Sequence, residues 1–277
     1  MRVALACLAA LTLLTLASAA AAPSFGDDVS FLEKHCDPVV LKGEDGQMRV
    51  AVVPLYQGRV MTSTARGEGG MSFGWMNREL IKSGQRAAHM NAFGGEDRFW
   101  LGPEGGQYSL YFDPGMPFEL AHWQVPAPID WGAWQVNSRQ SGSVNFKKRM
   151  QLDNYAGAEF DIAVNRTVGL LDADDTADLL DVQPGDDVEM VAFRSDNTIE
   201  NAGNRTWRKR SGLVSVWILG QFKASPDTTV VVPFKDREGA NPEQVVNDAY
   251  FGEIADDRLK VEDGLVFFKA DANSRGK

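Results

Sequence analysis

Cysteine and histidine are scarce in this chain, which has two cysteines and three histidines in 277 residues. Zinc ribbons and metal clusters use several such side chains per site, so these classes are excluded. The sequence also lacks the H-E-x-x-H and G-x-S-x-G motifs, the P-loop and the dinucleotide fingerprint. We therefore expect neither a metal site nor a cofactor, and no common hydrolase signature is present.

Long clusters of lysine and arginine are also absent. The chain has 28 basic and 38 acidic side chains, and its formal net charge is −10. A protein that binds nucleic acid or an anionic membrane surface normally presents a concentrated positive patch. Neither partner is expected here.

The single long apolar run lies at the start of the sequence, in residues 1–22. It combines one basic residue, Arg2, with an apolar core and a tail of small residues. This pattern is typical of a secretory signal peptide, and its core is too short for a stable membrane span. We expect a secreted or periplasmic protein with no membrane span after cleavage. Cleavage leaves Cys36 as the lone cysteine, so no internal disulfide is possible and a structural role is expected for this thiol.

The rest of the chain has the pattern of a β-rich protein, with 44% hydrophobic and 10% aromatic residues. Short apolar runs rich in Val, Thr and aromatic residues alternate with glycine and Asx turns. The expected strands are 48–54, 58–65, 98–103, 107–112, 118–123, 133–138, 143–152, 159–171, 188–201, 213–222, 228–235, 249–254 and 264–271. Short helices are expected at 31–35, 77–84 and 174–182.

This succession of strands predicts an all-β, mainly antiparallel fold, a sandwich or barrel, because a βαβ rhythm is missing. No Pro/Gly/Ser-rich linker divides the chain, so residues 24–277 are expected to form one domain. The strand at 264–271 is followed almost at once by the last residue. We therefore expect the fold to be incomplete at the C-terminus, with this strand an unpaired, aggregation-prone edge.

Residues 89–124 carry the densest mixture of side chains suited to a sugar. Aromatic rings stack on the apolar face of a sugar, while amide and charged groups bind its hydroxyls. Glycine-rich turns allow backbone to approach a ligand closely. The candidate ligand-binding residues are Arg98, Trp100, Glu96, Gln107, Asn91 and Trp123. The alternative interpretation is that the glycines are ordinary turns and that Trp100 and Trp123 belong to the core.

The candidate catalytic residues in the same segment are His122, His89 and Glu104. Strand alternation at 118–123 places His122 on one face with Phe118 and Leu120, which also fits a core or rim histidine. His89 lies in a polar, loop-like context.

Alternation also predicts that Arg98 and Trp100 share one face of a strand while Phe99 faces the core. On this hypothesis Arg98 and Trp100 point into a binding cleft. The alternative is that Arg98 is a buried cation that needs a carboxylate partner such as Glu96 or Glu104.

Several strings together resemble a known family. They are GRVMTSTARG (58–67), SFGWMN (72–77), FGGEDRFWLGPEGGQYSLYF (93–112), FRSDNTIENAG (193–203), SVWILGQF (215–222) and TVVVPF (229–234). In this combination the chain resembles an uncharacterised family of secreted bacterial proteins related to the galactose mutarotase-like superfamily. The resemblance implies a β-supersandwich whose concave face binds carbohydrate.

Mutarotases of that superfamily use a histidine as the acid and a glutamate as the base, so the resemblance implies where such a pair would lie in this chain. Where that histidine is expected, this chain has Trp217, and the region of the glutamate lies beyond its last residue. We therefore expect a carbohydrate-recognising protein with a saccharide ligand. The alternatives are an epimerase, lyase or hydrolase that pairs His89 or His122 with Glu96 or Glu104, and a structural envelope protein without catalysis.

Overall fold

The computed structural model describes residues 22–185, 187–235, 245–246 and 252–273. The predicted signal peptide, apart from Ala22, and the first half of the strand expected at 249–254 lie outside these residues. Every strand pairing within the described ranges is antiparallel. The longest helix there has nine residues. The prediction of an all-β, mainly antiparallel fold is confirmed.

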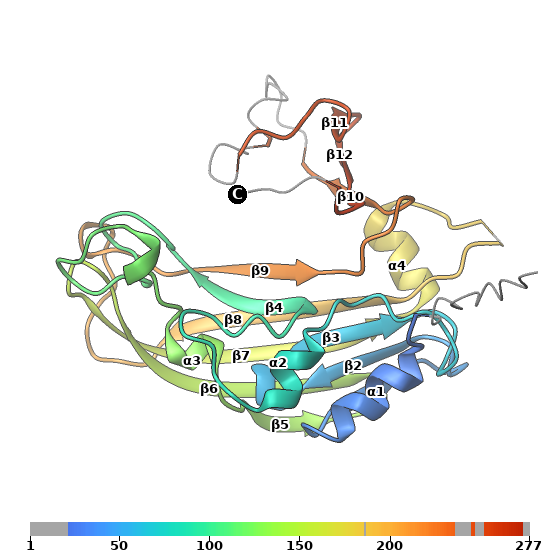
Figure 1. Ribbon diagram of the computed structural model, residues 1–277, viewed down its shortest axis with the longest axis horizontal. Coiled ribbons are helices and arrows are strands. Elements are labelled where there is room, and N and C mark those ends of the chain that lie inside the picture. Colours follow the sequence, from blue (N-terminus) through green and yellow to red (C-terminus); the bar gives the residue numbers. More distant parts are fainter. Residues whose placement is uncertain (1–21, 186, 236–244, 247–251, 274–277) are drawn as a thin grey trace, which may run out of the picture.

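A five-stranded sheet contains the N-terminal strands and has the order β1-β2-β3-β4-β9 (Figure 1). Its edge strand β9 pairs with β4, although strands β5 to β8 lie between these two strands in the sequence. The bounds are β1 Val39–Lys42, β2 Arg49–Val53, β3 Arg59–Thr64, β4 Gly95–Gly102 and β9 Ser215–Gln221.

A four-stranded sheet, β5-β6-β7-β8, follows the sequence order. Its two central strands are long and pair over eleven residue positions, because both sequences alternate without interruption. The bounds are β5 Gln135–Arg139, β6 Ser143–Asp153, β7 Glu159–Leu171 and β8 Ala192–Asn201.

The main hydrophobic core lies between these two sheets. Phe99 and Leu101 of β4 belong to the same buried cluster as Phe146 of β6 and Ile162 of β7. Gly58, which precedes β3, shows how closely the layers approach, since a Cβ atom there would lie 2.7 Å from the Phe146 ring. Phe99 therefore faces the core, as alternation predicted, and the two sheets form a sandwich.

Short helices cover the other face of the five-stranded sheet (Figure 1). Helix α1 (Phe25–Glu33) and helix α2 (Arg78–Ser83) contribute to a second buried cluster with Met61 of β3. Cys36 belongs to this cluster, and burial raises the pKa of its thiol to about 12. These facts support the structural role expected for Cys36.

The start of α1 offers a local test of stability. The Ser24 side chain accepts a hydrogen bond from the Asp27 backbone, and the Asp27 carboxylate accepts from the Ser24 backbone, which is a capping box. We expect Ser24→Ala to lower the free energy of unfolding by about 1 kcal/mol. Thermal unfolding measures this, with Ser138→Ala on exposed β5 as the control. Equal effects of the two substitutions would contradict the capping role.

A third, small sheet corrects the prediction made for the C-terminal strand. Its order is β10-β12-β11, so β12, which falls within 264–271, is the central strand and is paired on both sides. The predicted unpaired edge is therefore wrong. Strand β11, which pairs with β12, was not predicted from the sequence. The assignment of residues 24–277 to one domain stays a prediction. The bounds are β10 Thr229–Pro233, β11 Leu259–Glu262 and β12 Leu265–Lys269.

The strands expected at 107–112 and 118–123 do not form. Residues 107–112 are turns and bends, and Leu120–His122 is a 3-10 helix, η2. Pro114, Gly115 and Pro117 interrupt this stretch, and proline removes donors that a strand ladder needs. Phe118, Leu120 and His122 are accordingly exposed rather than aligned on one face of a strand.

The remaining helical elements are short connections. Helix α4 overlaps the helix expected at 174–182, and α3 was not predicted. Their bounds are α3 Ala127–Asp130 and α4 Ala173–Leu180, with 3-10 turns η1 Pro54–Tyr56 and η3 Lys209–Ser211. No helix of the described residues is long and apolar enough to cross a membrane.

Candidate functional site

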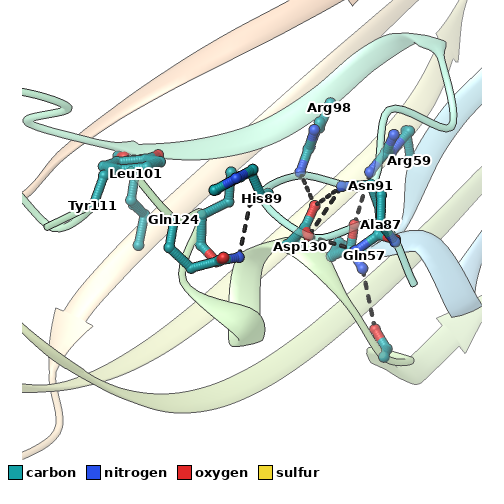
Figure 2. Close-up of polar contacts among 12 residues, drawn as sticks. Gln57, Arg59, Ala87, His89, Asn91, Arg98, Leu101, Tyr111, Gln124 and Asp130 are labelled. Atoms are coloured by element: carbon teal, nitrogen blue, oxygen red, sulfur yellow. Dashed lines mark hydrogen bonds and ion pairs between the residues drawn. The ribbon is translucent and has the colours of Figure 1, made fainter. Parts of the chain in front are cut away.

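The face of β4 that carries Arg98 and Trp100 is closed. Arg98 is 2% exposed and Trp100 1% exposed, whereas an open cleft requires accessible side chains. The hypothesis that both residues point into a cleft is therefore wrong. The physical reason is that the chain between β4 and β5 folds back and places Asp130 and Tyr111 over this face (Figure 2).

Arg98 is instead a buried, paired cation. Its Nη2 donates to Oδ1 of Asp130 at 2.7 Å, and both side chains are buried. Asn91 binds the same carboxylate through its side-chain amide, with Nδ2 2.6 Å from Oδ2, and through its backbone N–H (Figure 2). The alternative of a buried Arg98 thus holds, but its partner is Asp130 and not Glu96 or Glu104.

The aromatic residues of this region form a stack rather than a sugar platform. The rings of Trp100 and Tyr111 are stacked with centroids 5.7 Å apart, and Tyr111 stacks in turn on Trp123 at 5.6 Å. Trp217 of β9 packs against Trp100 from the neighbouring strand. Trp100 therefore belongs to the core, and Trp123 is a half-buried extension of it.

Glu96 is bound within the five-stranded sheet. Its Oε1 accepts from the Ser63 backbone N–H at 2.6 Å, and its Oε2 accepts from the Ser63 hydroxyl at 2.7 Å. Burial raises the pKa of this carboxyl to about 7, although the bonds from Ser63 oppose the shift. The side chain joins β3 to β4 and is 4% exposed.

The candidate catalytic residues are not assembled into an acid–base pair. His89 and His122 are exposed, and within the described chain neither forms an ion pair or hydrogen bond with a carboxylate. The His89 ring nitrogen Nδ1 lies 2.7 Å from the backbone oxygen of Trp123. Glu104 is half-buried, which raises the pKa of its carboxyl, and Gln107 is exposed. The structure therefore brings together Arg98 and Asn91, on Asp130, but not the histidines and Glu104.

A different surface, the outer face of the β5–β8 sheet, carries a hollow of the size of a ligand site. A hollow of about 490 Å³ crosses the middle of that face. Ligand sites for small molecules commonly have volumes of 300–1,000 Å³. The hollow is lined by Gln135, Lys147, Lys148, Arg149, Ala163, Val164, Asn165, Thr198 and Glu200.

A second hollow of about 410 Å³ lies farther along the same strands. Trp207 lines it together with amide, acidic and basic side chains, and the Trp207 ring packs edge-on against Phe160. The lining residues are Gln151, Leu152, Asp153, Glu159, Phe160, Asp161, Asn201, Gly203, Asn204, Arg205 and Trp207. None of the nine residues proposed from the sequence lines either hollow.

Some polar side chains of this face are held in place by one another. Arg149 donates two hydrogen bonds to Asp161, of 2.9 and 2.6 Å, in a bidentate pair. Asn145 donates to the side chains of Asn165 and Thr167 at 2.7 and 2.8 Å. These side chains are therefore already paired with one another across the strands.

Other side chains of the first hollow retain their full hydrogen-bonding capacity. Among the described residues, none binds the side chains of Lys147, Thr198 or Glu200, and all three are exposed. A cation, a hydroxyl and a carboxylate are thus available to a ligand in this hollow. Strand alternation in 143–152 and 188–201 places these three polar residues on one face of the sheet, and this pattern is visible in the sequence.

The described residues contain no group of three or more His, Cys, Asp or Glu side chains arranged to hold a metal ion. No curated protein and no solved structure matches the chain. Its sequence does match one family, described as a family of unknown function (DUF6786), over residues 23–277. Because this match covers nearly the whole sequence, the chain belongs to the DUF6786 family.

Proposed function

We propose that this protein recognises carbohydrate and that the saccharide lies along the outer face of the β5–β8 sheet. The observation that carries the proposal is the polar hollow on this face, in which the side chains of Lys147, Thr198 and Glu200 bind no other described residue. A second hollow at the end of the same strands adds Trp207, which is half-buried against the core. Sugar hydroxyls both donate and accept hydrogen bonds, so they require donors and acceptors side by side. An indole ring supplies the apolar surface on which a sugar ring stacks.

Recognition without catalysis is favoured over an enzyme acting on sugars. The exposed histidines lie outside both hollows and bind no carboxylate in the described chain. At the position where mutarotases have their histidine, Trp217 packs against Trp100. The two-sheet antiparallel sandwich and the resemblance in sequence support membership of the galactose mutarotase-like superfamily, which we include in the proposal.

Export to the periplasm or the outside of the cell is part of the same proposal. Its support is the sequence of residues 1–22, with a basic start, an apolar core and a tail of small residues. Expression of the full sequence in a bacterium, followed by N-terminal sequencing of the exported form, tests it. A processed N-terminus between Ala19 and Pro23 is expected, and retention of Met1 in the cytoplasm would contradict export.

A glycan array probed with the purified protein tests carbohydrate recognition. We expect binding to a defined set of saccharides and a roughly 10-fold or greater loss of affinity in Glu200→Ala, since hydrogen bonds to charged groups contribute about 1.5–3 kcal/mol. His122→Ala, an exposed substitution outside the hollows, is the matched control and is expected to bind as the wild type does. No binding to any glycan, or equal loss in both variants, would overturn the proposal.

A further inference from the structure

Arg59, the first residue of β3, is a fully buried cation without a counter-ion. It is 0% exposed, and it forms no ion pair with a carboxylate in the described part of the chain. Its two terminal nitrogens donate to neutral oxygens, the Gly94 carbonyl at 2.9 Å and Oε1 of Gln57 at 3.0 Å. Buried arginine is rare unless it is paired, because removing the charge from water is costly.

A second arginine lies next to Arg59. The pairing of Val60 with Asp97 places Arg59 opposite Arg98 on the adjacent strand. Figure 2 shows both guanidinium groups beside Asp130 and Asn91. Among the residues that the structure describes, the only carboxylate in ion-pair contact with either arginine is Asp130, which binds Arg98. Two positive charges therefore share one negative charge in a region closed to water.

Both guanidinium groups also have an unused donor. The Nε–H groups of Arg59 and Arg98 are buried, and neither has a hydrogen-bond partner among the described residues. Burial lowers the pKa of Arg59, and the neighbouring charge of Arg98 lowers it further. A third buried arginine, Arg166, does not share this excess, since its own carboxylate partner is Asp97.

We propose that a small monovalent anion of the halide class binds beside Arg59, accepts its Nε–H and balances the charge of the cluster formed by Arg59, Arg98 and Asp130. One negative charge is what the cluster needs, which favours a monovalent ion. The complete burial of Arg59 favours an ion without bulky substituents. The site is independent of the proposed saccharide surface, so either proposal can fail without the other.

Bromide is the direct probe of this site, because its anomalous scattering identifies it in a crystal. We expect crystals of the protein grown in sodium bromide to show an anomalous peak within hydrogen-bond distance of Arg59 Nε. In solution, replacing methanesulfonate by chloride at constant ionic strength should raise the melting temperature by about 2–4 °C, the shift that modest stabilisation gives in a chain of this size. No anomalous peak at Arg59, or equal melting temperatures in the two salts, would overturn the proposal.

A variant that supplies the missing charge within the chain provides the second test. Gln57→Glu places a carboxylate where Oε1 already accepts from Arg59, and replaces the Nε2 group that donates to the Gly132 carbonyl at 3.3 Å by an oxygen. We expect it to abolish the difference between chloride and methanesulfonate. Arg149→Gln, which removes an exposed arginine paired with Asp161, should retain the full difference. A full chloride effect in Gln57→Glu would also overturn the proposal.

Discussion

Replacing Asp130 by alanine is expected to lower the free energy of unfolding by about 3–5 kcal/mol. The substitution removes the carboxylate that accepts from Arg98 at 2.7 Å and from the Asn91 side chain at 2.6 Å. Arg98 then stays buried with no negative partner in the described chain, next to the equally buried Arg59. Urea unfolding of the wild type and the variant measures the difference.

Asp161→Ala is the matched control for this prediction. Asp161 also binds an arginine through two hydrogen bonds, but its partner, Arg149, is largely exposed to solvent. Solvent screens such a pair, so its loss is expected to have a much smaller effect than the loss of Asp130. Equal stabilities of the wild type and Asp130→Ala would show that the buried pair does not hold this part of the fold.

The second large effect is a dependence of stability on pH that originates at Glu96. Burial raises the pKa of its carboxyl in the folded protein to about 7, from an ordinary value of 4.5. The folded state thus retains the proton more strongly than the unfolded state does. The resulting stability is fully present below about pH 4.5 and is lost as the pH rises through 7.

Comparison of the wild type with Glu96→Gln between pH 4 and 8 isolates this contribution. The glutamine side chain does not titrate, and its oxygen can still accept the hydrogen bond from the Ser63 N–H. Relative to this variant, the wild type should lose roughly 3 kcal/mol of unfolding free energy between pH 4 and 8, because each unit of pKa difference corresponds to about 1.4 kcal/mol. Ser63→Ala removes a hydroxyl that favours the ionised form, so it should extend the loss to higher pH. Parallel stability curves for the wild type and Glu96→Gln would contradict the origin at Glu96.

The strands that the sequence predicted well are the long alternating ones. The range expected at 159–171 coincides with β7, and that at 143–152 differs from β6 by one residue. Both strands bury one face against the sandwich core and expose the other, so their local pattern determines their structure. Residues 107–123 also contain apolar side chains, but proline and glycine break the strand there, and the chain packs through aromatic contacts instead.

The candidate site was predictable only in part, for a similar reason. Alternation correctly placed Arg98 and Trp100 on the face opposite to Phe99. Which face is open to solvent depends on how residues 103–131 fold back, and the key partner, Asp130, is 32 residues away from Arg98. The outer face of the β5–β8 sheet shows the converse case. Its polar residues alternate visibly in the sequence, but the hollows arise only when four strands lie side by side.

A crystal structure of the protein with a saccharide selected on the glycan array is the most direct test of where the ligand binds. The proposed function predicts saccharide density over the outer face of the β5–β8 sheet, in contact with Thr198 or Glu200 in the first hollow or stacked on Trp207 in the second. Density against residues 89–124, with contacts to His122 or Gln107 and none to the sheet face, would contradict it.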